Sequence, residues 1–336
     1  MRHPSRMTAP PPREHRPWAD AWHDALYGPA GFYRGSAPAE HFATSAQGLP
    51  GGGALLAEAV VALARRHGCT RVVDVGCGRG ELLARIREQD TRLHLTGVDV
   101  VAAPAGLDVD AWLVSPGGPG LPADLRDLTD TLVLAHEWLD VVPCPVVQRD
   151  EAGVWRTLLV DADGTEVLGP PPDEADRAWA DRWLGPQVRR AEIGRPREDA
   201  LADLAGRVRS GVVVVVDYGH TQGTRPPHGT LTGFRHGREV EPVPDGSCDL
   251  TAHLAVDAAA DTLDNHDAGP AHVLTQREVL LQLLGDPTGS VPHALARTDP
   301  TAYLRAVGRR SSIAALTAPG GLGDFWWIIH PVDRDA

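Results

Sequence analysis

A glycine loop that directly follows an aliphatic run limits the folds open to this chain. The run Arg71–Val75 is followed by Gly76, Gly78 and Gly80, within the sequence Gly-Cys-Gly-Arg-Gly-Glu. Glycines at the end of a buried strand let the backbone turn with positive φ and let a ligand approach without meeting a Cβ atom. The loop therefore predicts a nucleotide-like ligand at the carboxyl end of a strand.

The spacing of this loop separates two kinds of nucleotide ligand. A dinucleotide-binding loop needs its third glycine three residues after the second, but that position is Glu81, whose charge would repel a pyrophosphate at the helix start. The spacing, preceded by Asp74, instead resembles motif I of class I S-adenosylmethionine (SAM)-dependent methyltransferases. Asp99 closes the next predicted strand, where both families hold ribose hydroxyls with a carboxylate. We expect Asp74, the three glycines, Asp99 and Cys77 to form the SAM site, with Cys77 serving loop geometry and not nucleophilic catalysis.

Aliphatic runs alternate with segments of helical apolar spacing on both sides of the loop. Gly53–His67 has the apolar pattern of a helix, and Leu93–Asp99 has that of a second strand. Helix, strand, loop, helix and strand in this order are the opening of a parallel α/β sheet. Further strands are predicted at Thr131–His136, Gly211–Asp217, Ala271–Leu274 and Asp324–His330.

The remaining segments predict additions to this sheet. Val146–Val160, interrupted by Asp-Glu-Ala-Gly at 150–153, predicts a hairpin. A helix bearing Trp179 and Trp183 is expected to form a cap, in which the two rings pack and do not stack on a ligand. We expect an α/β, Rossmann-like class I SAM-dependent methyltransferase sheet with an N-terminal lid and an inserted hairpin and helical cap. The expected divisions are a disordered tail (1–16), a lid segment (17–52), a cofactor-binding half (53–143), the insertion (144–200), the rest of the sheet (201–331) and a tail (332–336), with 17–331 as one domain.

Composition excludes several classes of protein. The longest aliphatic run, Val212–Val216, is far shorter than the roughly 20 residues of a membrane helix. The net charge of −13 disfavours nucleic acid as a partner, because that binding needs a basic face. Four widely spaced cysteines argue against a zinc site and a disulfide framework. Met1–Arg16 has no apolar stretch for a secretory signal, so we expect a cytoplasmic protein. We also expect no membrane span and no metal.

A second cluster of chemical groups follows the predicted strand Thr131–His136. Its position places His136, Glu137 and Asp140 at the carboxyl edge of the sheet, where open α/β folds keep their ligands. Two carboxylates at that edge are strong candidates for contact with the methyl acceptor. Here the chain resembles the MidA family of methyltransferases, which carries Asn-Glu-x-x-Asp-Ala-x-Pro; Glu137, Asp140 and Pro143 match this motif, while His136 and Val141 depart from it.

Further matches to the MidA family extend from about Trp18 to Pro331. Residues 27–33 resemble its Tyr-Gly-x-x-Gly-Tyr-Tyr element, with Tyr27 and Tyr33, and residues 41–45 resemble its Asp-Phe-x-Thr segment, with Thr44. Two later motifs also agree with the family. They are Asp-Tyr-Gly at 217–219, which contains Tyr218, and Asp-Leu-Thr-Ala-His at 249–253, which runs from Asp249 to His253. The chain departs from the family at His41, which replaces aspartate, at Asp74 and Asp99, which replace glutamates, and between Val100 and Asp110, where the Ser-x-x-Leu-x-x-x-Gln stretch is missing.

The matching residues also have structural interpretations. Tyr27, Phe32 and Tyr33 would either pin the N-terminal segment to the core or gate the substrate. Asp249, Thr251 and His253 would either form a turn or helix cap or belong to the active site.

The resemblance implies SAM as the cofactor and a protein arginine as the methyl acceptor. Mitochondrial relatives in the family act as assembly factors for respiratory complex I, so a complex I subunit is the partner that the resemblance suggests. Glu137 and Asp140 would hold the N–H groups of a guanidinium, and His136 or His253 would carry away its proton. Two alternatives remain: a non-catalytic assembly factor with a SAM fold, and a small-molecule N- or O-methyltransferase. A nicotinamide dehydrogenase is disfavoured by Glu81.

Overall fold

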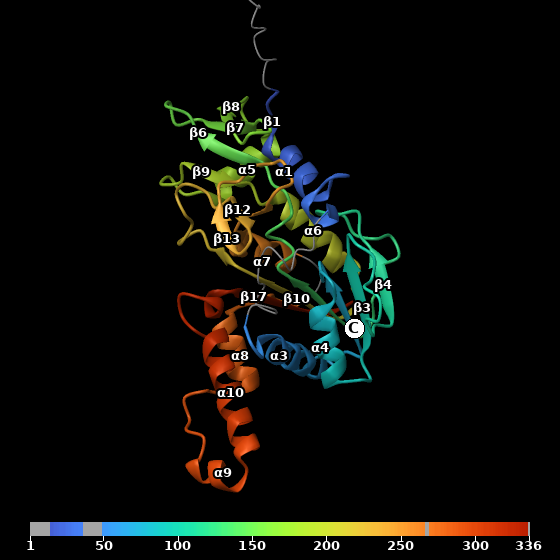
Figure 1. Ribbon diagram of the computed structural model, residues 1–336. Coiled ribbons are helices and arrows are strands. Elements are labelled where there is room, and N and C mark those ends of the chain that lie inside the picture. The colour runs from blue at the N-terminus through green and yellow to red at the C-terminus, as the bar shows by residue number, and fades with distance from the viewer. Residues whose placement is uncertain (1–13, 36–48, 266–268, 335–336) are drawn as a thin grey trace, which may run out of the picture.

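The computed structural model describes residues 14–35, 49–265 and 269–334. Figure 1 shows a central body, a smaller β-rich region at the top, and a helical arm that projects from the opposite side of the body. The expected segment at 41–45, which includes Thr44, lies outside the described residues.

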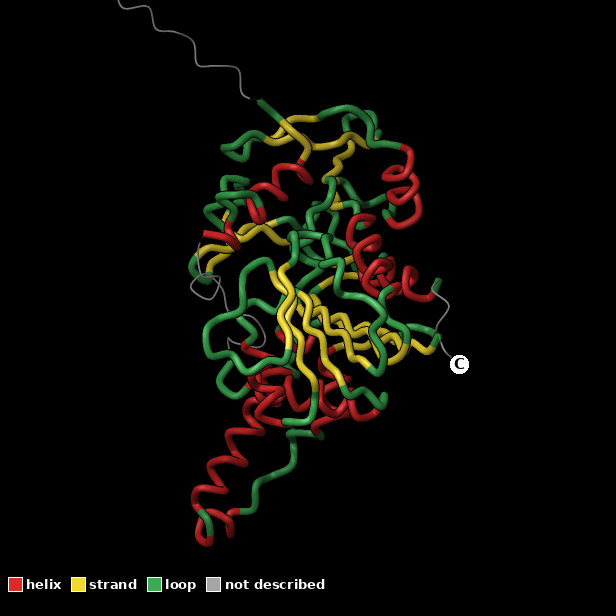
Figure 2. The backbone as a smooth tube through the Cα atoms, turned by 90° about the vertical axis from the view of Figure 1, so that its right-hand side faces the viewer, coloured by secondary structure: helices red, strands yellow, loops and turns green. Residues whose placement is uncertain are grey.

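A seven-stranded sheet forms the centre of the molecule (Figure 2). Its strands lie in the order β16-β17-β10-β5-β2-β3-β4, and β17 is antiparallel to both of its neighbours. The strands β4, β3, β2, β5 and β10 are parallel, and the chain order reverses between β2 and β5, which is where open α/β sheets bind their ligands. The bounds are β2 Arg71–Val75, β3 His94–Asp99, β4 Ala111–Val114, β5 Thr131–His136, β10 Ser210–Asp217, β16 His272–Thr275 and β17 Trp326–Asp333.

Successive side chains along each strand point to opposite faces of the sheet, and both faces are apolar. In β10, Val212, Val214 and Val216 belong to one buried cluster, while Val213 and Val215 belong to another. The first cluster includes apolar residues of α3 (Gly52–Arg66), α4 (Glu81–Gln89) and α8 (Gln276–Leu284). The second includes those of α6 (Arg195–Gly206) and α7 (Val256–Asp264). Because both faces are covered, the strands are nearly continuous aliphatic runs, and the predicted α/β class is confirmed.

A second sheet carries the inserted hairpin. The predicted hairpin is confirmed as β6 (Val146–Arg149) and β7 (Trp155–Val160). Three short strands extend it: β1 (Arg16–Pro17) and β8 (Glu166–Leu168) pair with β7, and β9 (Arg190–Glu192) pairs with β6. Beside it lies α5 (Glu174–Trp183), where Trp179 is buried in a separate apolar cluster and Trp183 packs against that cluster. The packing interpretation of both rings therefore holds.

A third sheet, β13-β12-β14, stands above the carboxyl edge of the central sheet. Its bounds are β12 Thr232–Arg235, β13 Arg238–Val240 and β14 Asp249–Thr251. Asp249 and Thr251 therefore lie in a strand, and the expectation of a turn or helix cap there is wrong. Two other short strands, β11 (Gly219–His220) and β15 (Leu254–Ala255), pair with each other just after β10 and β14.

The termini and the arm differ from the expectations. Arg16 pairs with Val160 in β1, so the N-terminal tail cannot include it, and β17 extends to Asp333, past the expected boundary at 331. The strand predicted to begin at Asp324 begins at Trp326, because Leu322–Asp324 form a 3₁₀ turn (η2). The remaining helices are α1 (Trp18–Tyr27), α2 (Phe32–Gly35), α9 (His293–Thr298) and α10 (Pro300–Leu316). The arm formed by α9 and α10 was not among the predictions.

Candidate active site

The glycine loop joins β2 to α4 at the switch point of the sheet. Gly76, Gly78 and Gly80 all have positive φ, at 73°, 60° and 76°. A Cβ atom at Gly80 would lie 2.6 Å from a methyl carbon of Leu107, whereas one at Gly78 would have only a Glu81 oxygen nearby, at 3.7 Å. At Gly80 the left-handed φ favours glycine and a Cβ atom would also displace the Leu107 side chain, whereas Gly78 leaves open space beside the backbone.

Asp99, at the end of β3, is tied to this loop. Its carboxylate accepts hydrogen bonds from the backbone N–H of Gly78 (2.8 Å) and of Val101 (3.3 Å). Burial raises the pKa of Asp99 to about 6, and these backbone donors oppose the rise. Asp74, inside β2, is buried, and the loss of hydration raises its pKa to about 8. Cys77 lines the same pocket with a pKa raised by burial, which does not favour a nucleophilic thiolate.

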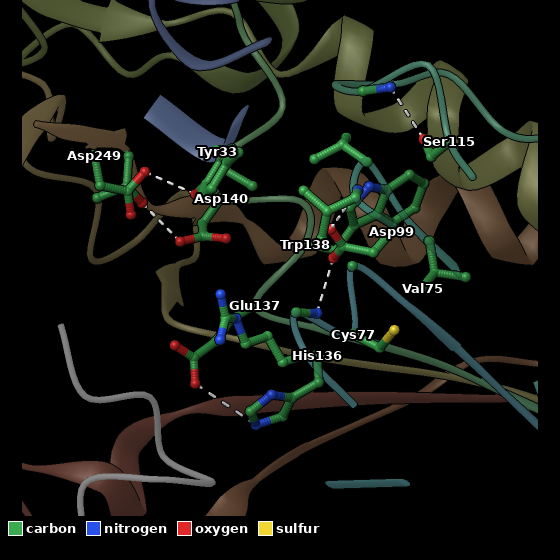
Figure 3. Close-up of a pocket in the computed structure, with 18 of the residues that line it drawn as sticks. Tyr33, Val75, Cys77, Asp99, Ser115, His136, Glu137, Trp138, Asp140 and Asp249 are labelled. Atoms are coloured by element: carbon green, nitrogen blue, oxygen red, sulfur yellow. Dashed lines mark hydrogen bonds and ion pairs between the residues drawn. The ribbon is translucent and has the colours of Figure 1, made fainter. Parts of the chain in front are cut away.

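The residues that follow β5 form the next part of the site. Glu137 has φ of 51°, a left-handed conformation that is uncommon for a residue other than glycine. Its N–H donates to the carbonyl of Val216 in β10 (2.8 Å), so the backbone is held where it turns. Its carboxylate lies 3.6 Å from Nε2 of His136, whose pKa burial lowers to about 4 (Figure 3). Strained backbone of this kind is often found at functional sites.

Asp140 lies at the centre of a buried polar network. Its Oδ2 accepts hydrogen bonds from the hydroxyls of Tyr218 (2.6 Å) and Thr251 (2.7 Å), and those two hydroxyls also contact each other. Its Oδ1 is buried and has no hydrogen-bond partner among the described residues. Burial raises the pKa of Asp140, while the two hydroxyl donors lower it. An unpartnered buried oxygen has a cost unless a ligand donates to it.

Two more buried carboxylates flank Asp140. Asp217 accepts from the backbone N–H of Asp140 (3.1 Å) and is fully buried, which raises its pKa well above the usual range. Asp249 accepts from the hydroxyl of Tyr33 (2.7 Å), and burial raises its pKa to about 8. We call Glu137, Asp140, Asp217 and Asp249 the carboxylate cluster.

Arg197, on α6, holds the cluster's backbone in place. It is 2% exposed, and its guanidinium donates to four backbone carbonyls: Asp140 (2.7 Å), Val142 (3.2 Å), Ala252 (3.0 Å) and His253 (2.8 Å). The segment after β5 is thereby fastened to the segment after β14. Arg197 is a site residue that was not predicted, since nothing in its local sequence marks an arginine that binds distant carbonyls.

The N-terminal helices close one side of the site. Tyr27 is buried and donates to the carbonyl of Val141 (3.0 Å), and its ring lies 5.5 Å from that of Tyr33. Phe32 is buried in the apolar cluster around α1. Trp22 donates to the carbonyl of Leu250 (2.9 Å). Phe32 thus pins the segment to the core, whereas Tyr27 and Tyr33 both pin it and line the pocket.

Most of these groups line one pocket of about 1140 Å³, whereas Asp217, Arg197, Trp22 and Phe32 are not among its lining residues. Except for Gly80 and Thr44, every predicted site residue lines it; Gly80 caps α4 behind the loop, and Thr44 is not described. His253 lies with its ring 5.1 Å from that of Tyr218, in an edge-on arrangement. Seven carboxylic acids and two arginines line the pocket: Asp74, Glu81, Asp99, Glu137, Asp140, Glu239, Asp249, Arg34 and Arg79.

Within the described ranges, no three histidine, cysteine, aspartate or glutamate side chains are grouped so that they could hold a metal ion. All four cysteines are free. Among the helices of the described part of the chain, none is both long and apolar enough to cross a membrane.

Comparisons with known proteins agree with this geometry. Residues 119–273 match the model of a family described as "Putative S-adenosyl-L-methionine-dependent methyltransferase". A search of curated proteins finds no match. A candidate methyl transferase from Burkholderia thailandensis, solved with S-adenosylhomocysteine, is 20% identical with a TM-score of 0.75 over 96% of this chain and 89% of its own. An uncharacterized protein of the same superfamily and organism is 21% identical with a TM-score of 0.73, over 96% and 88%.

The structural likenesses show the fold, and the family match covers the stretch that holds Glu137, Asp140, Tyr218 and Asp249. The open space at Gly78 and the carboxylate of Asp99 beside it suit a ribose-bearing cofactor. On this match and this fold, the protein is a SAM-dependent methyltransferase.

Proposed function

We propose that this methyltransferase is of the MidA type and N-methylates the guanidinium of a protein arginine. The observation that carries the proposal is the carboxylate cluster: Glu137, Asp140 and Asp249 line the pocket, and Oδ1 of Asp140 is buried with no partner among the described residues. A guanidinium has five N–H donors in a planar fork and matches carboxylates in both charge and geometry. By the resemblance to MidA proteins, the substrate would be a subunit of respiratory complex I.

The glycine loop and Asp99 would hold SAM, which supplies a methyl group already activated by its sulfonium. The chain's own residues then have three tasks: to align the acceptor nitrogen at about 3 Å, to exclude water, and to accept one proton. Glu137 and Asp140 hold the N–H groups that do not react, so that positive charge is drawn away from the reacting nitrogen.

The raised pKa of Asp140 couples binding of the acceptor to loss of a proton from this acid. Without a cation in the pocket, burial favours the protonated acid. A guanidinium beside it favours the carboxylate, so acceptor binding and loss of this proton are coupled. Either His136 or His253 would accept the proton released by methylation; burial lowers the pKa of both, that of His136 to about 4, which makes His136 a weak base.

The charge of the pocket disfavours a small apolar acceptor. Its volume of about 1140 Å³ includes the proposed SAM site, and acids outnumber basic residues on its walls. The two arginines do not neutralise the cluster, since the guanidinium of Arg34 donates to the carbonyls of Tyr27 (2.9 Å) and Pro116 (3.4 Å), and Arg79 belongs to the glycine loop.

Labelled SAM incubated with the protein and a lysate of its own organism tests the proposal. We expect the label in a protein and, after digestion and mass spectrometry, on an arginine side chain. Label on lysine, on a hydroxyl or in a small molecule would contradict the arginine assignment. SAM binding without any turnover would instead indicate the non-catalytic assembly factor.

A further inference from the structure

Few residues of the helical arm are fully buried. It projects from the body in both views, with α9 at its tip and α10 running back to the body (Figures 1 and 2). No residue of α9 is buried, and the 17-residue α10 buries only Ile313 and Leu316, at its body end. A helix normally gains most of its stability in a protein by packing one apolar face, and here the outer part of α10 packs against the short helix α9, with the rings of His293 and Tyr303 6.5 Å apart.

One face of α10 carries an apolar stripe exposed to solvent. Leu304 is 68% exposed and Val307 is 37% exposed, one helical turn apart. Ser311 and Ala314 continue the same face at spacings of four and three residues, and both are exposed. In the described part of the chain, Leu304 is the most exposed large apolar side chain.

The base of the arm is firmly attached to the body. Arg309 makes two hydrogen bonds with the carboxylate of Glu58 on α3 (2.5 and 2.8 Å), and the hydroxyl of Ser312 donates to the carbonyl of Pro50 (2.9 Å). Asp299 caps the outer end of α10 by accepting from the N–H of Ala302 (2.9 Å). The stripe is therefore presented on an anchored, capped helix.

The charge of the arm is opposite to that of the rest of the chain. Residues 293–310 contain four arginines and one aspartate, a formal charge of +3, in a chain whose total is −13. Arg297 and Arg305 are exposed, and neither has an ion-pair partner within the described residues. The remaining residues therefore carry −16, and the arm is a basic projection on an acidic protein.

We propose that the arm binds the acidic body of a second copy of this chain, giving a dimer in which each arm contacts the partner's body. Charge selects this arrangement, because contact between two arms or between two bodies brings like charges together, whereas arm against body brings opposite charges together. The apolar stripe supplies the buried area, and Arg297 and Arg305 supply the attraction around it.

Analytical ultracentrifugation of the full chain over a range of concentrations tests the dimer. We expect a mass twice the 35.8 kDa of one chain, with a dissociation constant that rises steeply as salt is raised from about 0.05 to about 1 M. A protein that stays monomeric up to about 100 μM would overturn the proposal, since a Kd above that range is too weak for a stable dimer.

Two matched pairs of variants locate the contact. Leu304→Asp should weaken dimerisation at least tenfold, whereas Val154→Asp, at a 47% exposed apolar residue of the hairpin, should not. Arg305→Glu should weaken it in the same way, whereas Arg126→Glu, the same change on the exposed surface of the body, should not. Because all four positions are exposed, folding is expected to be retained and is checked by SAM binding. A dimer that survives both arm variants would overturn the proposal.

Discussion

Most of the glycine loop and most of the carboxylate cluster line the same pocket, but the two regions are built in different ways. The loop is local: Gly76, Gly78 and Asp99 belong to one strand–helix–strand unit, and their hydrogen bonds are to nearby backbone groups. The cluster is assembled from distant segments, because the hydroxyl of Thr251 reaches Asp140 across 111 positions and that of Tyr33 reaches Asp249 across 216. A local site can be predicted from a motif, whereas an assembled site depends on the whole topology.

The largest effect is expected from a change at Glu137, which should impair turnover and leave SAM binding intact. Glu137→Gln removes the charge proposed to hold the guanidinium but keeps the shape, so turnover should fall by 10² to 10³, or about 2.7–4 kcal/mol. SAM affinity, measured by calorimetry, should stay close to the unmodified value. Glu239→Gln, which changes another carboxylate lining the pocket, serves as the matched control and should lose little activity.

Glu137→Gly sharpens this test. Because Glu137 has φ of 51°, glycine relieves a strained conformation worth about 1 kcal/mol. The variant should be at least as stable to denaturant as the unmodified protein and yet inactive. If both Glu137 variants keep full turnover, or if they lose SAM binding, the division between the two regions is wrong.

Asp99→Ala should produce the next largest effect, on the cofactor alone. The change removes the acceptor for the N–H groups of Gly78 and Val101 and the carboxylate proposed to bind the ribose. We expect SAM affinity to fall by about 10- to 100-fold, or 1.4–2.7 kcal/mol. Thermal melts give the same contrast, because SAM at a hundred times its Kd stabilises the unmodified protein by about 2.7 kcal/mol. Asp99→Asn, which can still accept one hydrogen bond, should be intermediate, and an unchanged Kd in both variants would exclude Asp99 from the SAM site.

A smaller effect concerns the network inside the cluster. Thr251→Val keeps the shape of a buried side chain but removes one of the two hydroxyl donors to Asp140, which should cost about 1–2 kcal/mol of unfolding free energy. Thr157→Val in β7 is the matched control, since no hydrogen bond of that hydroxyl is present among the described residues. Equal losses in urea denaturation would mean that the network adds nothing to stability.

The smallest effect is a change in pH dependence. Burial raises the pKa of Asp249 from an ordinary 3.8 to about 8, so between pH 4 and 8 the folded state binds more protons than the unfolded state. This contribution to stability is complete below pH 4 and lost as pH rises through 8. Asp249→Asn should reduce the decline in unfolding free energy between pH 6.5 and 8 by up to about 1.4 kcal/mol per pH unit.

The glycine-loop side offers a parallel measurement. Asp74 also has a pKa raised to about 8 by burial, so Asp74→Asn should reduce the same decline independently. Titration of His136 does not affect the unfolding free energy between pH 6.5 and 8, since its pKa of about 4 affects stability only between pH 4 and 6.5. An unchanged slope in both variants would show that neither acid retains its proton in the folded state.

The sequence predicted the sheet well because its strands are buried on both faces. Aliphatic runs such as Thr131–His136 have the same bounds in the structure. The edge strand β4, Ala111–Val114, was missed because it is four residues long and half exposed, so it has no continuous apolar run. The arm was missed for a related reason: α9 buries nothing and α10 buries only its end, so its few apolar residues, such as Leu304 and Val307, do not mark a core-facing helix.

The candidate site divides in the same way. Glu137 and Asp140 could be placed at the ligand edge because they follow a predicted strand directly. The hydroxyl groups that donate to Asp140 and the contacts of Arg197 could not be predicted, since they depend on where β14 and α6 lie relative to β5. Long-range polar contacts leave no periodic pattern in a sequence.

Arg197 also constrains how this protein can diverge. Its guanidinium joins carbonyls on either side of a gap of more than a hundred positions, from Val142 to Ala252. Since backbone carbonyls are present whatever the side chains are, those segments are free to change residue type but not length or path. Lysine could not replace Arg197, because an ammonium has three donors and no planar fork to reach four carbonyls. Insertions and deletions near 140–142 and 252–253 are therefore expected to be rare in relatives that keep this arginine, even where the surrounding sequence has drifted.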